Sequence, residues 1–191
     1  MNSIDFEKIA RELFGAVLEP YGFTTEGSRH CTFHRKVNNE IFNVIIPDLG
    51  SNGVWYDIKV APLSPALDPL FEERYPDNVG IYTDAYLSRY CGVGQEQQKF
   101  NCKYAENFRR IFENEVRDLI AVHAINYLEN INTVSDLLHL IKHDLVRGFA
   151  LHYLGRHQEA RPILEAQKKR FSNSNDPNVK KMIKYLDKLL D

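Results

Sequence analysis

The sequence predicts an α+β protein in which an N-terminal helix leads into an antiparallel β-meander sheet and then a helical C-terminal half. Three patterns predict it: apolar residues at helical spacing from Phe6 to Leu18, period-two alternation across residues 28–62, and renewed helical spacing after Tyr104. The 191 residues are 43% hydrophobic and 26% charged, which is typical of a globular protein. We expect an α+β domain over residues 1–142 and a helical tail over residues 143–191, packed on it as one compact unit.

An amphipathic helix opens the chain. Asn2 or Ser3 can cap its start, because short polar side chains accept hydrogen bonds from the first free N–H groups of a helix. Pro20 and Gly22 mark its end. The residues that recur at the spacing of a core-facing stripe are Phe6, Ile9, Ala10, Leu13, Phe14, Val17 and Leu18.

The meander follows as three predicted strands over residues 29–35, 41–46 and 54–60. Asn52-Gly53 favours a tight turn before the third strand. Alternation divides the first strand into one face with Cys31 and Phe33 and another with His30, Thr32 and His34. It divides the third into an apolar face with Val54, Tyr56, Ile58 and Val60 and a second face with Trp55, Asp57 and Lys59.

The remaining chain is predicted to be mostly helical. Residues 62–103 are broken by prolines, with one short strand or helix expected within 81–90. A long helix then carries the stripe Phe108, Ile111, Phe112, Val116, Leu119, Ile120 and His123, in which His123 is expected to be a core histidine. Thr133 and Asp136 resemble a capping box that starts a helix reaching Leu145. Two further helices are expected over residues 157–171 and 178–190.

The N-terminus, the apolar runs and the cysteine content indicate the cellular compartment. The N-terminus has no apolar h-region, and no apolar run approaches the roughly 20 residues that span a bilayer, so we expect no membrane partner. Three cysteines (Cys31, Cys91 and Cys102) form no CxxC pair, which argues against a disulfide framework. These observations predict a cytoplasmic protein.

Residues 150–164 resemble the middle of a tetratricopeptide repeat. Leu154-Gly155 stands at the turn between two helices, followed by Glu159-Ala160 and then Leu164. One copy is visible, and stacking needs about three repeats. The resemblance therefore implies an αα-hairpin over about residues 143–171, docked on the body, with recruitment of partners as one alternative role.

A second resemblance covers roughly residues 4–142. It rests on the opening helix, Tyr21-Gly22-Phe23 at its end, and residues 32–35, 43–46 and 130–138. In these the chain resembles the bacterial domain-of-unknown-function family 4304. Small domains of this kind look similar to immunity proteins of toxin systems, so the resemblance implies a module that binds and blocks a toxin.

One set of residues in the sequence is a candidate for catalysis. Gly92-Val93-Gly94 lacks the third glycine of GxGxxG, and neither a P-loop nor a GxSxG elbow occurs, so we expect no nucleotide cofactor. Asp136, His139 and His143 have spacings that place them on one flank of the predicted helix. Such a set could hold zinc in a metal-assisted hydrolase, although a solvated helix flank is the simpler interpretation. We expect no bound metal.

The charge distribution favours a protein partner. Residues 37–98 hold nine acidic and three basic side chains, while residues 168–188 hold seven basic and two acidic ones. The basic tail carries no nucleic-acid motif, and the pI is about 6.4, so nucleic acid is not the expected partner. We predict a non-enzymatic module that binds a basic protein through aromatic anchors and carboxylates. The candidate surface is Trp55, Asp57, Glu72, Glu73, Tyr82, Asp84 and Tyr86.

Overall fold

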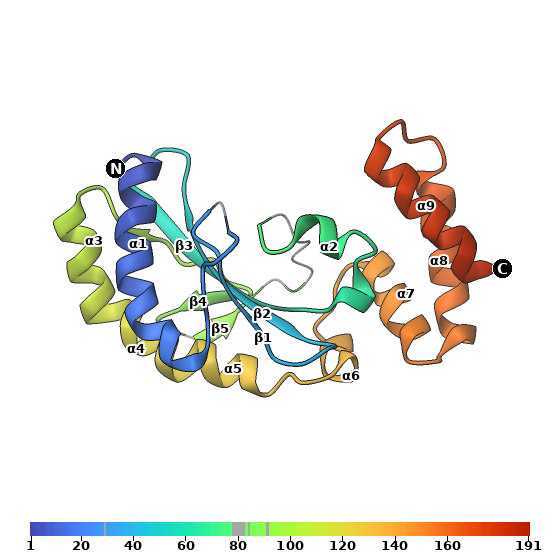
Figure 1. Cartoon of the computed structure of the whole chain (residues 1–191), viewed down its shortest axis with the longest axis horizontal. Coiled ribbons are helices and arrows are strands. Elements are labelled where there is room, and N and C mark those ends of the chain that lie inside the picture. The colour runs from blue at the N-terminus through green and yellow to red at the C-terminus, as the bar shows by residue number, and fades with distance from the viewer. Residues whose placement is uncertain (29, 78–82, 84, 91) are drawn as a thin grey trace.

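The computed structural model describes residues 1–28, 30–77, 83, 85–90 and 92–191. Within these residues six strands form one antiparallel sheet (Figure 1). The N-terminal helix, the meander and the helical C-terminal half follow one another in the expected order, so the α+β prediction is confirmed. No helix in the described part of the chain is both long and apolar enough to cross a membrane.

Helix α1 (Ser3–Leu18) begins and ends where its sequence predicts. The Asn2 side chain caps it, accepting a hydrogen bond of 2.8 Å from the Asp5 N–H. A 3₁₀ turn (Glu19–Tyr21) then leads to Gly22, whose φ of 80° needs a residue without a Cβ. The predicted apolar stripe is buried, so α1 packs its apolar face against the sheet.

The sheet has the spatial order β1-β2-β3-β4-β5, with β6 also paired to β3. The strand bounds are β1 Phe33–Lys36, β2 Phe42–Leu49, β3 Trp55–Leu63, β4 Tyr86–Ser88, β5 Gly92–Gly94 and β6 Phe100–Asn101. The first strand is shorter than predicted, since it starts at Phe33 and leaves His30 outside the sheet. Thr32 is buried, so it does not share an exposed face with the histidines.

The predicted long helix runs from Ala105 to Glu129 but is not purely α-helical. Helices α3 (Ala105–Ile111), α4 (Arg117–Leu119) and α5 (Ile125–Glu129) are joined by the π segments Phe112–Val116 and Ile120–Ala124. Buried side chains recur every fourth residue at Phe108, Phe112, Val116, Ile120, Ala124 and Leu128. Successive residues of an α-helix are about 100° apart, so side chains four residues apart would gradually turn away from the sheet. The π segments have more residues per turn, and they keep this row of side chains facing the sheet.

His123 is exposed, so the prediction of a core histidine is wrong. The prediction assumed 3.6 residues per turn throughout, which brings residue 123 onto the apolar stripe. The π segments shift the buried row by a residue, and Ala124 occupies the core position instead. The His123 ring lies against Gly92, where a Cβ would be 3.0 Å from Nδ1 of the imidazole.

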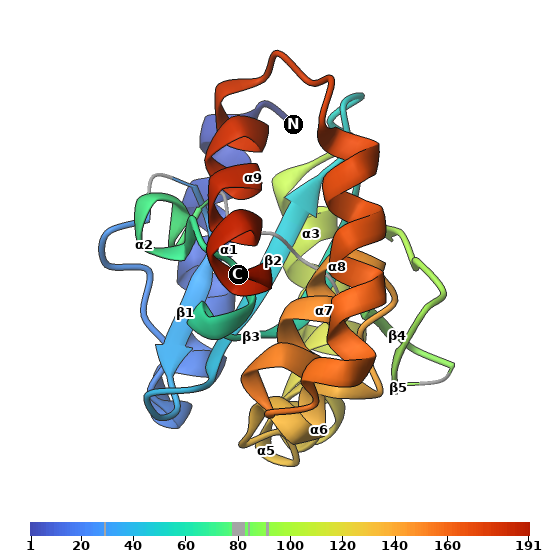
Figure 2. The ribbon, with the colours of Figure 1, turned by 90° about the vertical axis from the view of Figure 1, so that its right-hand side faces the viewer.

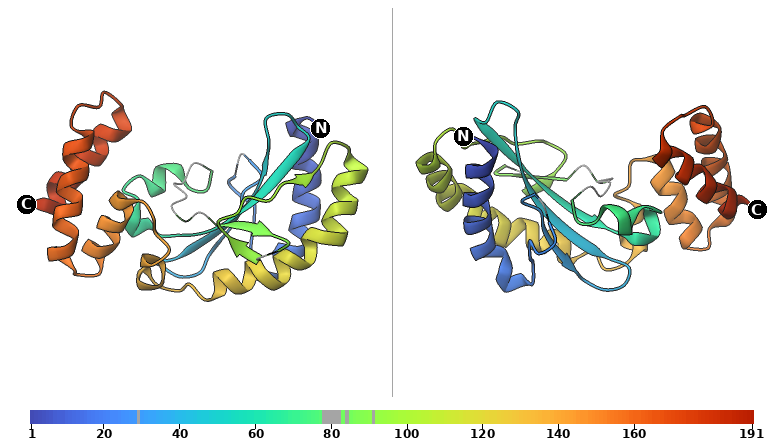
Figure 3. Two further views of the ribbon diagram at one scale, coloured as in Figure 1. Left: turned by 180° about the vertical axis from the view of Figure 1, so that it is seen from behind. Right: turned by 45° about the horizontal axis from the view of Figure 1, so that its top comes forward.

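Two apolar clusters lie on opposite faces of the sheet. The first joins α1 and the Ala105–Glu129 helix to sheet residues such as Ile45 and Ile58. The second joins Val44 and Ala61 to α2 (Phe71–Arg74) and to the C-terminal helices. Seen from behind, the C-terminal helices lie at the end of the molecule opposite α1 and α3 (Figure 3).

The tail contains the predicted αα-hairpin and one more helix. Helices α7 (Asp144–Tyr153) and α8 (His157–Phe171) reverse direction at Gly155, whose φ is 74°. Gly148 on α7 lies so close to α8 that a Cβ would be 2.5 Å from Cδ2 of Leu164. Helix α9 (Pro177–Leu190), capped by Asp176, runs beside α8 (Figure 2).

The predicted helix between residues 134 and 145 is broken. Helix α6 (Val134–Leu138) starts at the predicted capping box but ends before His139, and α7 starts only at Asp144. Between the two, Ile141 is 5% exposed and packs in the second cluster. The chain changes direction at Ile141, where its side chain packs into the second cluster. The helical spacing in the sequence does not predict this break.

Candidate functional site

Three of the predicted surface residues lie on one face of the sheet. Trp55 and Asp57 are two residues apart on β3, so their side chains point to the same side of the sheet. Tyr86 on β4 is directly opposite Lys59 of β3, which places it on that side as well. Asp48 of β2 is directly opposite Asp57. We call Asp48, Trp55, Asp57, Lys59 and Tyr86 the polar sheet patch.

The other predicted surface residues do not join this patch. Glu72 and Glu73 are exposed on α2, and the Glu73 carboxylate forms an ion pair of 2.6 Å with Lys181 of α9. The described residues of the predicted surface therefore lie on two elements, the sheet and α2. Tyr82 and Asp84 lie outside the described residues.

Asp57 is the buried charge of the patch. Asp57 is 8% exposed, and its Oδ2 accepts a hydrogen bond from Nε2 of Gln97. Oδ1 is buried and has no hydrogen-bond partner among the described residues. Loss of hydration raises the pKa of Asp57, an effect that the Gln97 hydrogen bond and the charges of Lys59 and Lys99 partly oppose.

Lys59 is hydrogen-bonded to Asp48 and not to Asp57 among the described residues. Its Nζ donates to Oδ2 of Asp48, on the neighbouring strand. Partial burial lowers the pKa of Lys59, but the hydrogen bond and charge of Asp48 outweigh it and raise the value overall. The carboxylates of Asp48 and Asp57 therefore lie directly opposite each other on adjacent strands, and that of Asp48 is hydrogen-bonded to Lys59.

A pocket of about 160 Å³ opens beside Asp57. Trp55, Gln97 and Lys99 line it together with the turn at residues 50–52. Trp55 is 40% exposed, so its indole ring is available at the rim. A small pocket with a buried carboxylate oxygen and an exposed aromatic ring suits a planar group that donates hydrogen bonds.

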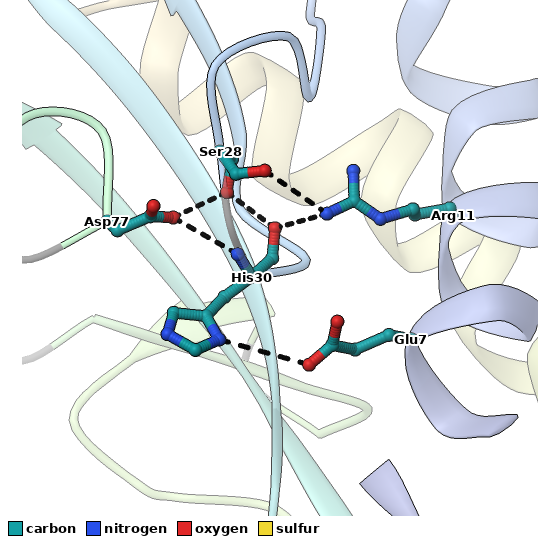
Figure 4. Close-up of polar contacts among 5 residues, drawn as sticks. All are labelled: Glu7, Arg11, Ser28, His30 and Asp77. Atoms are coloured by element: carbon teal, nitrogen blue, oxygen red, sulfur yellow. Dashed lines mark hydrogen bonds and ion pairs between the residues drawn. The ribbon is translucent and has the colours of Figure 1, made fainter. Parts of the chain in front are cut away.

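A larger groove of about 540 Å³ lies between the start of α1 and the last part of β2. Glu7, His30 and Asp48 line it, and Nδ1 of His30 is 3.9 Å from Oε1 of Glu7 (Figure 4). Cys31 also lines the groove, but it is buried, and burial raises the pKa of its thiol to about 12. A thiol that stays protonated is a poor nucleophile, so Cys31 is a small apolar side chain here, as predicted.

The predicted metal ligands do not converge. Asp136 belongs to the capping box, where Oδ2 accepts from the N–H groups of Asn132 at 3.0 Å and Thr133 at 2.9 Å. These backbone hydrogen bonds lower the pKa of Asp136. His139 follows the end of α6 and His143 precedes α7, so the three residues do not share one helix flank. Within the described residues no group of three His, Cys, Asp or Glu side chains could hold a metal ion.

The sequence did not single out Gln97 or Asp48. Gln97 lies in an irregular segment before β6, where no periodicity indicates which way a side chain points. Asp48 resembles a turn residue, yet β2 continues through it to Leu49. Lys59 was detectable, because alternation places it on the face of Trp55 and Asp57.

Comparisons with known proteins add no function to this geometry. No family model, no curated protein and no solved structure matches the chain. The resemblances to family 4304 and to immunity proteins therefore stay predictions.

Proposed function

We propose that the protein is a non-enzymatic protein-binding module whose polar sheet patch receives a basic side chain of its partner. One observation carries the proposal: the buried Oδ1 of Asp57 has no hydrogen-bond partner among the described residues, beside an indole ring that is 40% exposed. A buried carboxylate oxygen without a donor is unfavourable in the free protein. A donor supplied by the partner removes that penalty.

An arginine side chain of the partner fits the pocket best. Its planar guanidinium carries several N–H donors, one of which would bond Oδ1 of Asp57 once the side chains that cover this buried oxygen shift, while Gln97 keeps Oδ2. The same plane can stack on the Trp55 ring. The guanidinium charge would lower the pKa of Asp57, so the bound carboxylate would be ionised.

The rest of the acidic region supports the same kind of partner. Residues 37–98 carry nine acidic and three basic side chains, an excess that attracts a basic surface from a distance. Glu72 contributes to this excess, while Glu73 is partly neutralised by Lys181. The mechanism we propose is occlusion: the patch covers a basic site on its target, as an immunity-type inhibitor covers a toxin.

The test uses Trp55 as its own reporter, because it is the one tryptophan of the chain. Its fluorescence is titrated with N-acetyl-arginine amide and, as a neutral analogue of the same shape, N-acetyl-citrulline amide. The arginine probe should change the emission and the citrulline probe should not. Asp57→Asn should abolish the response, whereas Asp118→Asn, which removes an exposed carboxylate on α4, should preserve it.

The same variants then test partner binding in the full chain. Proteins captured by the wild type should be lost with both Trp55→Ala and Asp57→Asn but retained by Tyr104→Ala, which removes an aromatic ring that is 60% exposed elsewhere. A partner that binds Asp57→Asn as tightly as the wild type would refute the assignment of this patch.

A further inference from the structure

The outer edge of β2 is only partly covered. Strand β1 pairs with β2 from Phe33 opposite Ile45 to Lys36 opposite Phe42. β2 itself continues to Leu49, paired on its other side with β3. Among the described residues, no strand pairs with the outer edge of residues 46–49. This edge lines the groove of about 540 Å³.

The pairing pattern shows which backbone groups face that edge. His34 exchanges both backbone hydrogen bonds with Thr24, at 2.9 and 2.8 Å, so its N–H and C=O point away from β2. Backbone groups of successive residues alternate in direction, so those of Ile45 point toward β1. Pro47 and Leu49 are two and four residues after Ile45, so their backbone groups point to the uncovered edge. The edge therefore presents the N–H and C=O of Leu49 and the C=O of Pro47, since proline has no N–H.

The chain that would otherwise continue β1 is held away from this edge. Nη2 of Arg11 donates to the carbonyl oxygens of His30 at 2.6 Å and Ser28 at 3.5 Å (Figure 4). Oδ1 of Asp77 accepts from the hydroxyl of Ser28 and from the N–H of His30 at 3.4 Å. The backbone groups of His30 are thereby engaged by side chains, and the edge of β2 stays accessible.

The Glu7 carboxylate is the acidic group that the groove offers to a basic side chain. Glu7 and Asp48 contribute carboxylates to its lining, of which that of Asp48 is bonded to Lys59. The N-terminal ammonium of Met1 also lines the groove and donates to the carbonyl oxygen of Gly53 at 2.7 Å. Among the described residues no lysine or arginine side chain lines it. The Glu7 side chain is one-third exposed, and among the described residues its Oε1 lies 3.9 Å from Nδ1 of His30. Two copies of this chain would bring these carboxylates together, so like charge disfavours self-pairing.

We propose that an extended basic segment of the partner protein binds in this groove as an added strand on the edge of β2. Its backbone bonds the free groups of Leu49 and Pro47, and a basic side chain lies against Glu7. This inference rests on the proposed function and adds the partner's binding mode. The groove and the Asp57 pocket share the turn at residues 50–52 in their linings, so one partner can occupy both.

The experiment uses a short synthetic peptide of alternating lysine and valine as the probe. It is titrated into the ¹⁵N-labelled full chain, and the amide resonance of Leu49 is followed by NMR. Two matched peptides are compared: one with glutamate in place of lysine, and one with every backbone nitrogen methylated. The lysine peptide should shift the Leu49 resonance, the glutamate peptide should bind about tenfold more weakly, and the methylated peptide should not bind.

Two charge-reversal variants separate local from long-range attraction. Glu7→Lys, in the groove, should weaken the lysine peptide by about tenfold. Glu26→Lys changes the net charge equally at an exposed site outside the groove lining, and should leave binding nearly unchanged. Equal losses in both variants would overturn the groove assignment. So would peptide binding that survives methylation, or no binding at millimolar peptide.

The outcomes also separate this inference from the proposed function. Asp57→Asn should bind the lysine peptide as the wild type does, since Asp57 does not line the groove. If the peptide fails to bind the wild type while partner capture still depends on Trp55 and Asp57, the added strand is refuted and the pocket stands. A concentration-dependent dimer with a protected Leu49 amide would assign the edge to a second copy and overturn the partner strand.

Discussion

At the scale of single residues, Asp57 combines features that oppose folding. Its residue is 8% exposed, one carboxylate oxygen lacks a donor among the described residues, and the nearby lysine on its own strand is bonded to Asp48. An ionised carboxylate in such surroundings destabilises the folded state. Side chains kept at the expense of stability are common where a protein binds another molecule.

Replacing this carboxylate should therefore stabilise the protein. Burial raises the pKa of Asp57 above its ordinary value of 3.8, so the folded state favours the protonated form. Its contribution to stability is present below that value and is lost as the pH rises through the folded-state pKa. Asp57→Asn should raise the free energy of unfolding by about 1 kcal/mol at neutral pH. The gain should vanish in acid.

Urea unfolding of wild type and variant at neutral and acid pH checks this prediction. Asp118→Asn is the control, because its carboxylate is exposed and its removal should give the same small effect at both pH values. If Asp57→Asn lost stability equally at both pH values, Asp57 would be a structural residue rather than one held ready for a partner.

At the scale of elements, two glycines in helices have opposite surroundings. A Cβ on Gly148 would be 2.5 Å from Cδ2 of Leu164, which is fully buried and has little room to move. A Cβ on Gly15 in α1 would meet its nearest atom, Oε1 of Glu19, at 3.4 Å, an ordinary contact. Alanine favours a helix over glycine by about 1 kcal/mol, whereas overpacking costs about 1–3 kcal/mol.

The two substitutions should thus change stability in opposite directions. Gly148→Ala should lower the melting temperature because α7 and α8 are forced apart, and Gly15→Ala should raise it. Thermal unfolding followed by circular dichroism measures both. A stabilised Gly148→Ala protein would show that the close approach of α7 to α8 does not occur in solution.

Elements formed by local chemistry were predictable from the sequence. Helix α1 follows from its stripe and its cap, and α6 starts at the capping box of Thr133 and Asp136. The π segments were not predictable, because they arise when the buried row of a long helix must stay on one sheet face. The misplaced His123 and the broken helix after Leu138 have this common cause: tertiary packing overrides a regular 3.6-residue period.

The candidate site was predictable to the extent that strand alternation defines it. Trp55 and Asp57 share a face for that reason alone. Glu72 and Glu73 were grouped with them by charge, yet α2 is positioned by ring contacts of Phe71 with Phe42 and Tyr75. The contact of Phe71 with Phe42, between segments far apart in the sequence, leaves no periodic pattern there.

At the scale of the whole molecule, the sheet joins the two apolar clusters. Val44 and Ala61 on one face belong to the cluster that includes Leu164 and Leu186 of the tail. Neighbouring residues of the same strands, Ile45 and Val60, belong to the cluster beneath α1. We therefore expect the body and the tail to unfold together.

Leu164→Ala tests this coupling. The side chain is fully buried, so its truncation should cost about 2–5 kcal/mol. Fluorescence of Trp55 reports on the sheet, and circular dichroism reports mainly on the helices. Both midpoints should fall together. An unchanged fluorescence midpoint beside a lowered circular dichroism midpoint would show that the tail unfolds by itself.

The position of Pro47 has a consequence for aggregation. An uncovered strand edge with a full row of N–H and C=O groups is a template on which further copies of a chain can grow into fibrils. Pro47 removes one donor from the edge of β2, so a copy aligned along residues 46–49 meets a gap in the ladder. The edge can pair with one partner strand through Leu49, but it is a poor seed for an indefinitely growing sheet.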